Sequence, residues 1–301
     1  MTPTDVPQAA VQPVTTPLVA ADGYRLTALR YPAQGEPVAH LVVAGATGVP
    51  QGFYRRFAQH AAAQGFHVLT LDYRGIGLSR PESLRGFRMD YLDWARLDLA
   101  AAVDAVPQDG LPLVMVGHSY GGHAFGLLPN HQRVARFLTF ATGAGWHGWM
   151  PPLERLRVLF MWRVLGPLLT RWKGYLPWRL LGMGEDLPLD VYRQWRRWCQ
   201  YPRYFFDDPA MRAHRLAERF AAVRTPMVAL NALDDHWAPP VSRDAFVAAY
   251  RNAECRTVNL HPASLGLKSI GHMGYFRPAA RPLWDEVLGW LRAGPLVPDA
   301  R

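Results

Sequence analysis

The sequence predicts an α/β fold, in which a mostly parallel sheet carries helices on both faces. Short apolar runs alternate with longer amphipathic segments from about residue 18 to residue 294, which is typical of a parallel sheet. Between residues 145 and 222 the alternation stops, and it then resumes, which indicates a helical insertion in one domain. A chain of 301 residues, half of them apolar, is long enough to bury one large core.

The predicted sheet begins with an antiparallel hairpin, because residues 17–21 and 24–31 flank the turn dipeptide Asp22-Gly23. Each later strand is a short apolar run bounded by turn signals. In chain order, these strands are predicted at 40–44, 67–73, 111–118, 136–141, 225–232 and 255–260. Helical periodicity predicts helices at 53–64, 92–106, 242–251 and 281–293, with another after Gly122.

We expect the chain to divide into three parts. Residues 1–17, rich in Pro, Thr and Ala, are predicted as a flexible N-terminal tail. Residues 18–144 and 223–301 are predicted to form the α/β core. Residues 145–222, rich in Trp, Arg, Leu and Pro, are predicted to form an inserted helical cap above the core.

A serine motif ends the predicted strand 111–118. Residues 117–121, Gly-His-Ser-Tyr-Gly, match the pattern G-x-S-x-G. At a sharp turn from strand to helix this pattern projects the serine hydroxyl clear of the sheet, and the glycines leave room for the neighbouring strand and helix. We therefore predict Ser119 as a nucleophile and the amide of Tyr120 as a donor to a developing oxyanion.

A serine hydroxyl needs a base to activate it, and the base needs a group that orients it. Proteins with this motif place the acid and then the base after the serine in the chain. Asp234 and Asp235 directly follow the predicted strand 225–232. We prefer Asp235 as the acid, because it stands four residues before Pro239, a spacing that resembles the acid loop of many enzymes with this motif, and keep Asp234 as the alternative. The aspartate that is not the acid is expected to cap a turn.

Three histidines are candidates for the base: His236, His261 and His272. His236 is too close to the aspartates in sequence to be a separate partner. We prefer His272 to His261, because Gly271 and Gly274 let a short loop present its ring to the edge of the sheet.

The loop 45–48, which follows the predicted strand 40–44, is expected to supply the second oxyanion donor. We choose the amide of Ala46 and regard Thr47 as its neighbouring candidate. Side chains that bind substrate are expected in this loop, beside the serine and in the insertion. They are Thr47, His118, Trp146, Trp149, Trp237 and Met273.

Several strings in the chain resemble the α/β-hydrolase superfamily. They are AGATG (44–48), DYRGIGLS (72–79), GHSYGG (117–122), NALDDHWAPP (231–240) and GHMGYFR (271–277). The resemblance extends from about residue 18 to residue 294 and is greatest to the serine-aminopeptidase and monoacylglycerol-lipase-like group. It implies an α/β-hydrolase fold with an eight-stranded sheet, a covalent acyl-enzyme, and no metal or other cofactor. Ala44 departs from the pattern, since these proteins frequently have a histidine there.

On these grounds we expect a serine hydrolase that cleaves a carboxylic ester, or a related acyl bond, of a hydrophobic small molecule. A thioesterase, an amidase or peptidase, and an acyltransferase can use the same three side chains and stay open as alternatives. A protein that binds lipid or another ligand without catalysis belongs to a different class. The intact set of Ser119, His272 and an aspartate argues against it.

The chain has a formal charge of +9, and residues 151–220 hold 13 Lys and Arg against 7 Asp and Glu. No zinc-finger spacing or RNA-binding string accompanies this charge, so we do not expect nucleic acid as a partner. Residues 156–172 are apolar with spaced arginines, which is compatible with weak contact to a membrane surface through the cap. The tryptophans of the insertion are expected either to wall an apolar pocket or simply to pack cap helices against each other.

We expect a cytoplasmic protein. Residues 1–17 contain neither the basic nor the apolar region of a secretory signal, and no run of about 18 apolar residues is present. Cys199 and Cys255 lie far apart in sequence and are expected as free thiols in a reducing compartment.

Overall fold

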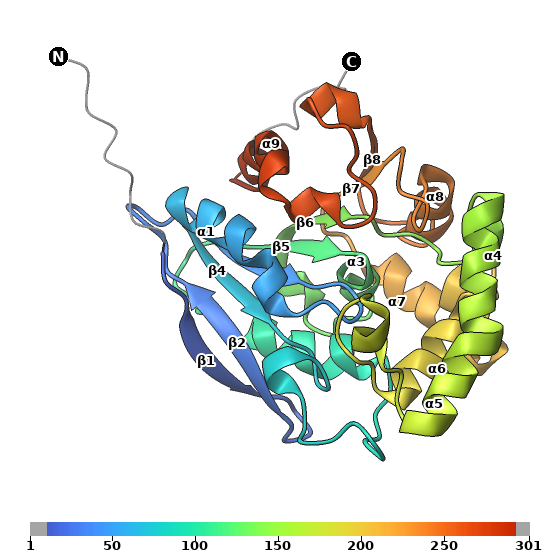
Figure 1. Cartoon of the computed structure of the whole chain (residues 1–301). Coiled ribbons are helices and arrows are strands. Elements are labelled where there is room, and N and C mark those ends of the chain that lie inside the picture. The colour runs from blue at the N-terminus through green and yellow to red at the C-terminus, as the bar shows by residue number, and fades with distance from the viewer. Residues whose placement is uncertain (1–10, 293–301) are drawn as a thin grey trace.

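The computed structural model describes residues 11–292, in which an eight-stranded, mostly parallel sheet lies between two layers of helices (Figure 1). This architecture confirms the predicted fold class. The strand order is β1-β2-β4-β3-β5-β6-β7-β8. β1 and β2 pair antiparallel, as do β2 and β4, and every later pair is parallel. The strands are β1 Val14–Val19, β2 Arg25–Tyr31, β3 Ala39–Ala44, β4 Phe66–Leu71, β5 Leu113–His118, β6 Val134–Phe140, β7 Met227–Ala232 and β8 Cys255–Leu260.

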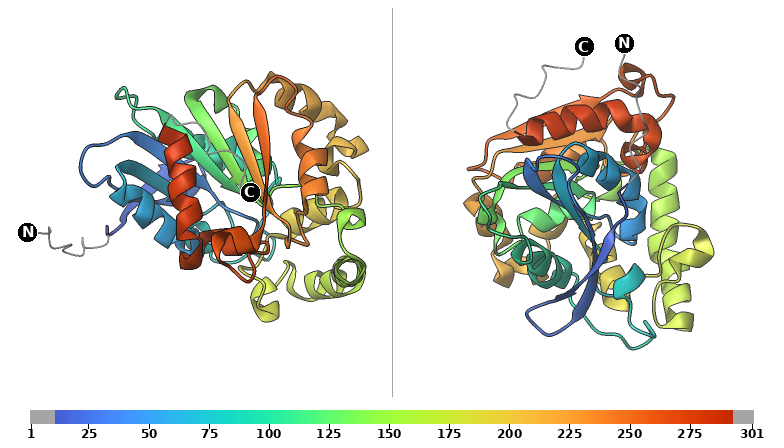
Figure 2. Two further views of the ribbon diagram at one scale, coloured as in Figure 1. Left: turned by 90° about the horizontal axis from the view of Figure 1, so that it is seen from above. Right: turned by 90° about the vertical axis from the view of Figure 1, so that its left-hand side faces the viewer.

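The helices of the core cover the two faces of the sheet separately (Figure 2). One face carries α1 (Arg55–Ala63) and α9 (Arg281–Arg292). The other carries α2 (Ala100–Asp104), α3 (Tyr120–Phe125) and α8 (Pro240–Val247). All residues of β3, β5 and β7 are buried, as expected for strands covered on both sides.

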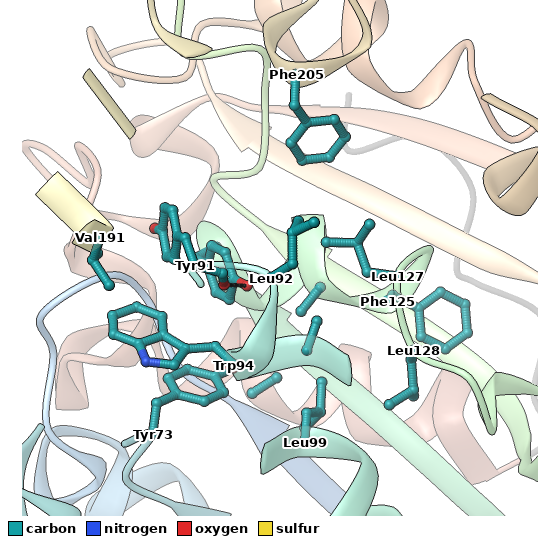
Figure 3. Packing of buried hydrophobic residues seen from close by; sticks show 14 of the residues in the cluster. Tyr73, Tyr91, Leu92, Trp94, Leu99, Phe125, Leu127, Leu128, Val191 and Phe205 are labelled. Atoms are coloured by element: carbon teal, nitrogen blue, oxygen red, sulfur yellow. Dashed lines mark hydrogen bonds between the residues drawn. The ribbon is translucent and has the colours of Figure 1, made fainter. Parts of the chain in front are cut away.

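Alternation along the strands gives the protein two apolar cores. In β3, Leu41 and Val43 belong to the core beneath α1 and α9, whereas Val42 and Ala44 belong to the core on the opposite face. The second core is larger, because buried side chains from residues 145–222 join it. Figure 3 shows Val191 and Phe205 of that segment facing the cluster that contains Tyr91.

Three local features differ from the sequence prediction. β1 begins at Val14, inside the predicted tail, because β2 provides a partner strand; residues 1–10 lie outside the described part. α3 begins at Tyr120 and not after Gly122, since the tight turn at Ser119 starts the helix at once. The predicted helix 92–106 starts with a π-helical stretch, Trp94–Leu99, before α2.

Residues 145–222 are helical and lie on the side of the sheet that carries α3 and α8. The α-helices are α4 Pro152–Phe160, α5 Gly166–Lys173, α6 Leu189–Trp198 and α7 Leu216–Ala222. A π-helical turn, Met161–Leu165, joins α4 to α5. The bridge between Leu176 and Leu187 is the only strand pairing within this segment, all of which is described.

The described residues also bear on the sequence expectations for membrane-spanning helices and for cysteines. Among residues 11–292, no helix is both long enough and apolar enough to cross a membrane. Cys199 is buried, Cys255 is half-buried, and both are free thiols.

Candidate active site

Ser119 occupies a strained turn between β5 and α3. Its φ is 52°, in the left-handed region that side chains rarely adopt. The turn is tight because α3 passes close to the strands: a Cβ at Gly117 would lie 2.7 Å from the backbone of Gly121, and one at Gly121 would clash with the carbonyl of Ala44. The glycines of the motif are therefore sterically required, and the serine is raised at the carboxyl edge of the sheet.

The structure brings the three predicted side chains together. The Nε2 atom of His272 lies 3.1 Å from the Oγ atom of Ser119, and its Nδ1 atom lies 2.9 Å from Asp235. Asp235 is fully buried and also accepts the backbone N–H groups of Trp237 and Ala238. Since these bonds fix the carboxylate, the Nδ1–H of His272 has a defined acceptor, and Nε2 is left to accept the serine proton.

Asp234 has a different position from Asp235. Its carboxylate accepts the hydroxyl of Ser269 and the backbone N–H groups of Ile270 and Gly271, so it anchors the loop that carries His272. Partial burial alone would raise the pKa of Asp234, but the hydrogen bonds, led by that of Gly271, bring the pKa below its usual value. The two adjacent aspartates thus hold the ring and the backbone of the same histidine loop.

The other two candidate bases lie away from the serine. His236 is exposed. The Nδ1 atom of His261 accepts the backbone N–H of Ala263 and caps a turn after β8.

The amides near Ser119 differ in availability. Among residues 11–292, the N–H groups of Tyr120 and Thr47 have no hydrogen-bond acceptor. The N–H of Ala46, our predicted donor, already donates to the hydroxyl of Tyr54 at 2.8 Å. This bond corrects the expectation that Ala46 offers a free amide. The sequence did not indicate it, because Tyr54 belongs to the following helical turn.

Tyr54 also links this loop to the histidine loop. Its hydroxyl accepts from Ala46 and therefore donates to the Nδ1 atom of His118, at 2.9 Å. The Nε2–H of His118 then donates to the carbonyl of His272, also at 2.9 Å. Burial, followed by the nearby imidazole of His272, lowers the pKa of His118 to about 3, so His118 stays neutral in this chain of hydrogen bonds. His118 is fully buried, which corrects the expectation that it contacts substrate.

A cavity of about 470 Å³ opens onto Ser119 and His272. Its other lining residues are predominantly apolar, and they come from the core and from residues 145–222. The large side chains of the lining are Phe53, Trp178, Met183, Trp195, Trp237 and Met273. The backbone of the loop 46–49 forms part of the wall, and its Thr47 directs a hydroxyl to that of Tyr91.

Only some of the predicted substrate-binding residues line the cavity. Thr47, Trp237 and Met273 line the cavity. Trp146 and Trp149 do not: their rings pack edge to face at 5.2 Å, and the Nε1–H of Trp149 donates to Pro202. This corrects the expectation for these two rings. Trp178 and Trp195, which do line the cavity, were missed because sequence gives the density of tryptophan in the insertion but not its direction.

The described residues contain no group of three or more His, Cys, Asp or Glu side chains that could hold a metal ion.

Comparisons with known proteins place this chain in a family. A model for serine aminopeptidase, S33, matches residues 35–263. His272 lies beyond that range. No curated protein matches by sequence.

Among solved structures, a soluble variant of monoglyceride lipase from Saccharomyces cerevisiae superposes with a TM-score of 0.66 at 16% identity, covering 96% of this chain and 97% of that one. The esterase domain of a Rhodothermus marinus protein gives 0.56 at 17%, covering 93% and 98%. The thioesterase domain from the curacin biosynthetic pathway gives 0.56 at 13%, covering 91% and 99%. At these identities the likenesses show the fold. Because the family model spans most of the chain, the protein belongs to the serine aminopeptidase S33 family of the α/β-hydrolase superfamily.

Proposed function

We propose that this protein is a serine hydrolase that cleaves a carboxylic ester, or a related acyl bond, of an uncharged hydrophobic molecule. One observation carries the proposal. Ser119, His272 and Asp235 are distant in sequence, yet they form a continuous hydrogen-bonded series beside the apolar cavity. This arrangement is the one that activates a serine hydroxyl for acyl transfer.

The reaction follows from the atoms in contact. As Ser119 Oγ attacks the acyl carbonyl, His272 Nε2 takes the proton of the serine hydroxyl. Asp235 stabilises the resulting imidazolium by accepting its Nδ1–H. The imidazolium then protonates the leaving alcohol, and an acyl-enzyme on Ser119 remains. Water, deprotonated by His272, attacks the acyl-enzyme and releases the acid. The oxygen of each tetrahedral intermediate needs amide donors.

The amide of Tyr120 is our first oxyanion donor, as the sequence predicted. For the second, the loop after β3 offers the free amide of Thr47, whereas that of Ala46 serves only if Tyr54 releases it. Removing one such donor typically costs roughly 3 kcal/mol of transition-state stabilisation.

The lining of the cavity supports an uncharged substrate. It includes no Asp, Glu, Lys or Arg side chain. A buried ammonium group needs a carboxylate partner, so a peptide with a free amino terminus finds no counterion there. Two carboxylates contact lining residues from outside the cavity, and both have partners: Asp235 binds His272, and Glu154 accepts the Nε1–H of Trp237 and pairs with Arg157. These features favour esters and thioesters over aminopeptidase substrates.

A series of p-nitrophenyl esters from acetate to dodecanoate tests the proposal. We expect turnover that increases with acyl length, because the wall is aromatic and apolar. Ser119→Ala should lower kcat at least about a thousandfold, whereas Ser264→Ala, a control at an exposed serine, should leave it unchanged. Turnover of thioesters or anilides alone would reassign the acyl bond. Absence of turnover on all three classes by folded protein would overturn the proposal.

A further inference from the structure

The helix formed by residues 152–173 has an unusual outer face. α4, the π-helical turn and α5 continue into one another, and at about 1.5 Å per residue they extend about 33 Å. Figure 1 shows them as one rod along the outer edge of the molecule, and the right-hand view of Figure 2 shows the same rod lengthwise. One side of the rod packs inward through Val158, Met161 and Trp162, which are buried.

The opposite side exposes a row of large apolar side chains. Their exposed fractions range from 43% at Val164 to 65% at Leu156. The row, which we call the apolar stripe, consists of Leu153, Leu156, Phe160, Val164, Leu168 and Trp172. Its members are three or four residues apart, so they follow one face of the helix. In an α-helix a spacing of four drifts slowly around the axis, and the wider π-helical turn offsets part of that drift.

The stripe does not resemble the scattered apolar residues of an ordinary surface, because its members are contiguous along the whole rod. Nothing among residues 11–292 covers it. Such a face indicates an interaction surface, and the charges beside it indicate the partner.

Beyond Glu154, which accepts from Trp237 and pairs with Arg157, the charged residues along the stripe are all basic. Residues 155–184 contain no Asp or Glu, and they contain Arg155, Arg157, Arg163, Arg171, Lys173 and Arg179. Arg157 pairs with Glu154, and Arg179 pairs with Glu185. In the described part of the chain, Arg155, Arg163 and Arg171 are exposed and have no carboxylate partner. At the end of the stripe, the ammonium of Lys173 lies 4.0 Å from the ring of Trp172.

This charge distribution separates two possible occupants of the stripe. A second copy of the chain, docked stripe to stripe, would bring two sets of arginines together without any acidic residue between 155 and 184 to pair with them. An anionic lipid surface supplies the missing negative charge, and its acyl region accepts the apolar side chains. Arginine side chains beside the stripe are long enough to reach the headgroups while their aliphatic stems stay buried.

We propose that the apolar stripe docks this protein onto the surface of an anionic lipid bilayer, with the helix 152–173 lying in the plane of the interface. Docking brings the cavity close to the membrane, because Glu154 in the first turn of the helix accepts a hydrogen bond from Trp237 in the cavity wall. The inference does not depend on Ser119 or on any reaction, so it can fail or succeed separately from the proposed function.

Co-sedimentation of the full chain with vesicles tests the inference. One set contains phosphatidylcholine alone, and the other contains phosphatidylcholine with phosphatidylglycerol. We expect binding to the second set, with added salt weakening it. Replacing three stripe residues, Leu156→Ser, Phe160→Ser and Leu168→Ser, should reduce the partition coefficient at least about tenfold. The control, Val19→Ser, Leu78→Ser and Val241→Ser, alters exposed apolar residues elsewhere and should stay within twofold of wild type.

A charge variant keeps the test decisive if the stripe variant folds poorly. Arg155→Gln, Arg163→Gln and Arg171→Gln leave the stripe intact and should weaken binding to phosphatidylglycerol vesicles by about tenfold or more. Wild type that sediments with neither vesicle set would overturn the inference, as would a control variant that loses as much binding as the stripe variant. A dimer in analytical ultracentrifugation that the stripe variant dissociates, without vesicle binding, would assign the face to a second copy.

Discussion

The carboxyl edge of the sheet and the 145–222 segment differ in the interactions that stabilise each of them. At the edge, hydrogen bonds fix each chemical group: Asp235 accepts two amides, Asp234 accepts three donors, and His118 binds the carbonyl of His272. In the segment, aromatic rings make the contacts. Trp195, for example, packs on Trp162 and Trp178, whose buried Nε1–H groups have no acceptor among the described residues.

This difference indicates how the two regions divide their tasks. Directional bonds allow little displacement of a nucleophile or base, and reaction rates depend steeply on such positions. Aromatic packing is less directional, so a segment held by it can change its cavity wall without unsettling the reacting groups. The comparison predicts that changes at the edge alter rate, whereas changes in the segment alter substrate preference.

The largest effect is expected from a pair of neighbouring substitutions. Asp235→Asn removes the acceptor that orients His272, so kcat on a preferred ester should fall about 10³- to 10⁴-fold. Asp234→Asn weakens only the anchor of the loop and should lower kcat by about tenfold or less. Steady-state kinetics measure both losses. A larger loss of kcat in Asp234→Asn than in Asp235→Asn would make Asp234 the acid.

A smaller effect is expected in the segment. Met183 lines the cavity and is 41% exposed, so Met183→Trp should narrow the cavity with little loss of stability. We expect kcat/KM for a dodecanoate ester to fall at least about tenfold, while that for an acetate ester changes less than about twofold.

Leu180→Trp is the matched control for Met183→Trp, because Leu180 is more exposed and does not line the cavity. It should leave both esters unaffected. Equal losses on short and long esters in Met183→Trp would mean that the segment controls rate as well as preference.

The smallest effect concerns stability and pH. The pKa of His118 is lowered to about 3 by burial, so the unfolded chain binds a proton below pH 6.5 that the folded chain does not bind. The stability that His118 contributes is therefore complete above pH 6.5 and is lost as the pH falls toward 3.

His118→Asn should remove that dependence. As the pH falls from 6.5 toward 3, the free energy of unfolding of the variant should decline more slowly than that of wild type. The two slopes should differ by about 1.4 kcal/mol per pH unit. Urea titrations at pH 7 and pH 5 give the change in unfolding free energy of each protein between the two pH values. A pH-independent loss of stability caused by the substitution cancels from this change. Parallel declines would show that His118 binds its proton over the same pH range in the folded and the unfolded protein.

The same division explains what the sequence could predict. The buried strands β3, β5 and β7 were predicted because a strand covered on both faces is a continuous apolar run. The placement of Ser119 followed from steric limits that a short motif records. The preference for His272 over His261 and for Asp235 over Asp234 followed from the flanking glycines and a proline, and the structure places the preferred residues beside Ser119.

Contacts that no short sequence motif records could not be predicted. The bond from Ala46 to Tyr54 and the bond from His118 to His272 depend on how loops meet, and neither leaves a pattern in one chain. The walls of the cavity were unpredictable for a related reason. The sequence around a tryptophan of the 145–222 segment does not state which way its ring points, and packing decides that Trp178 faces the cavity and Trp149 does not.

The central claim is that Ser119 is a nucleophile activated at the edge of the sheet. Labelling with a fluorophosphonate probe, followed by mass spectrometry of the digested protein, tests it most directly, since the probe needs no knowledge of the substrate. We predict a single adduct on the peptide that contains Ser119, its loss in Ser119→Ala, and much slower labelling in His272→Ala. An unlabelled wild type, or an adduct that survives Ser119→Ala at another residue, would rule out Ser119 as the activated nucleophile.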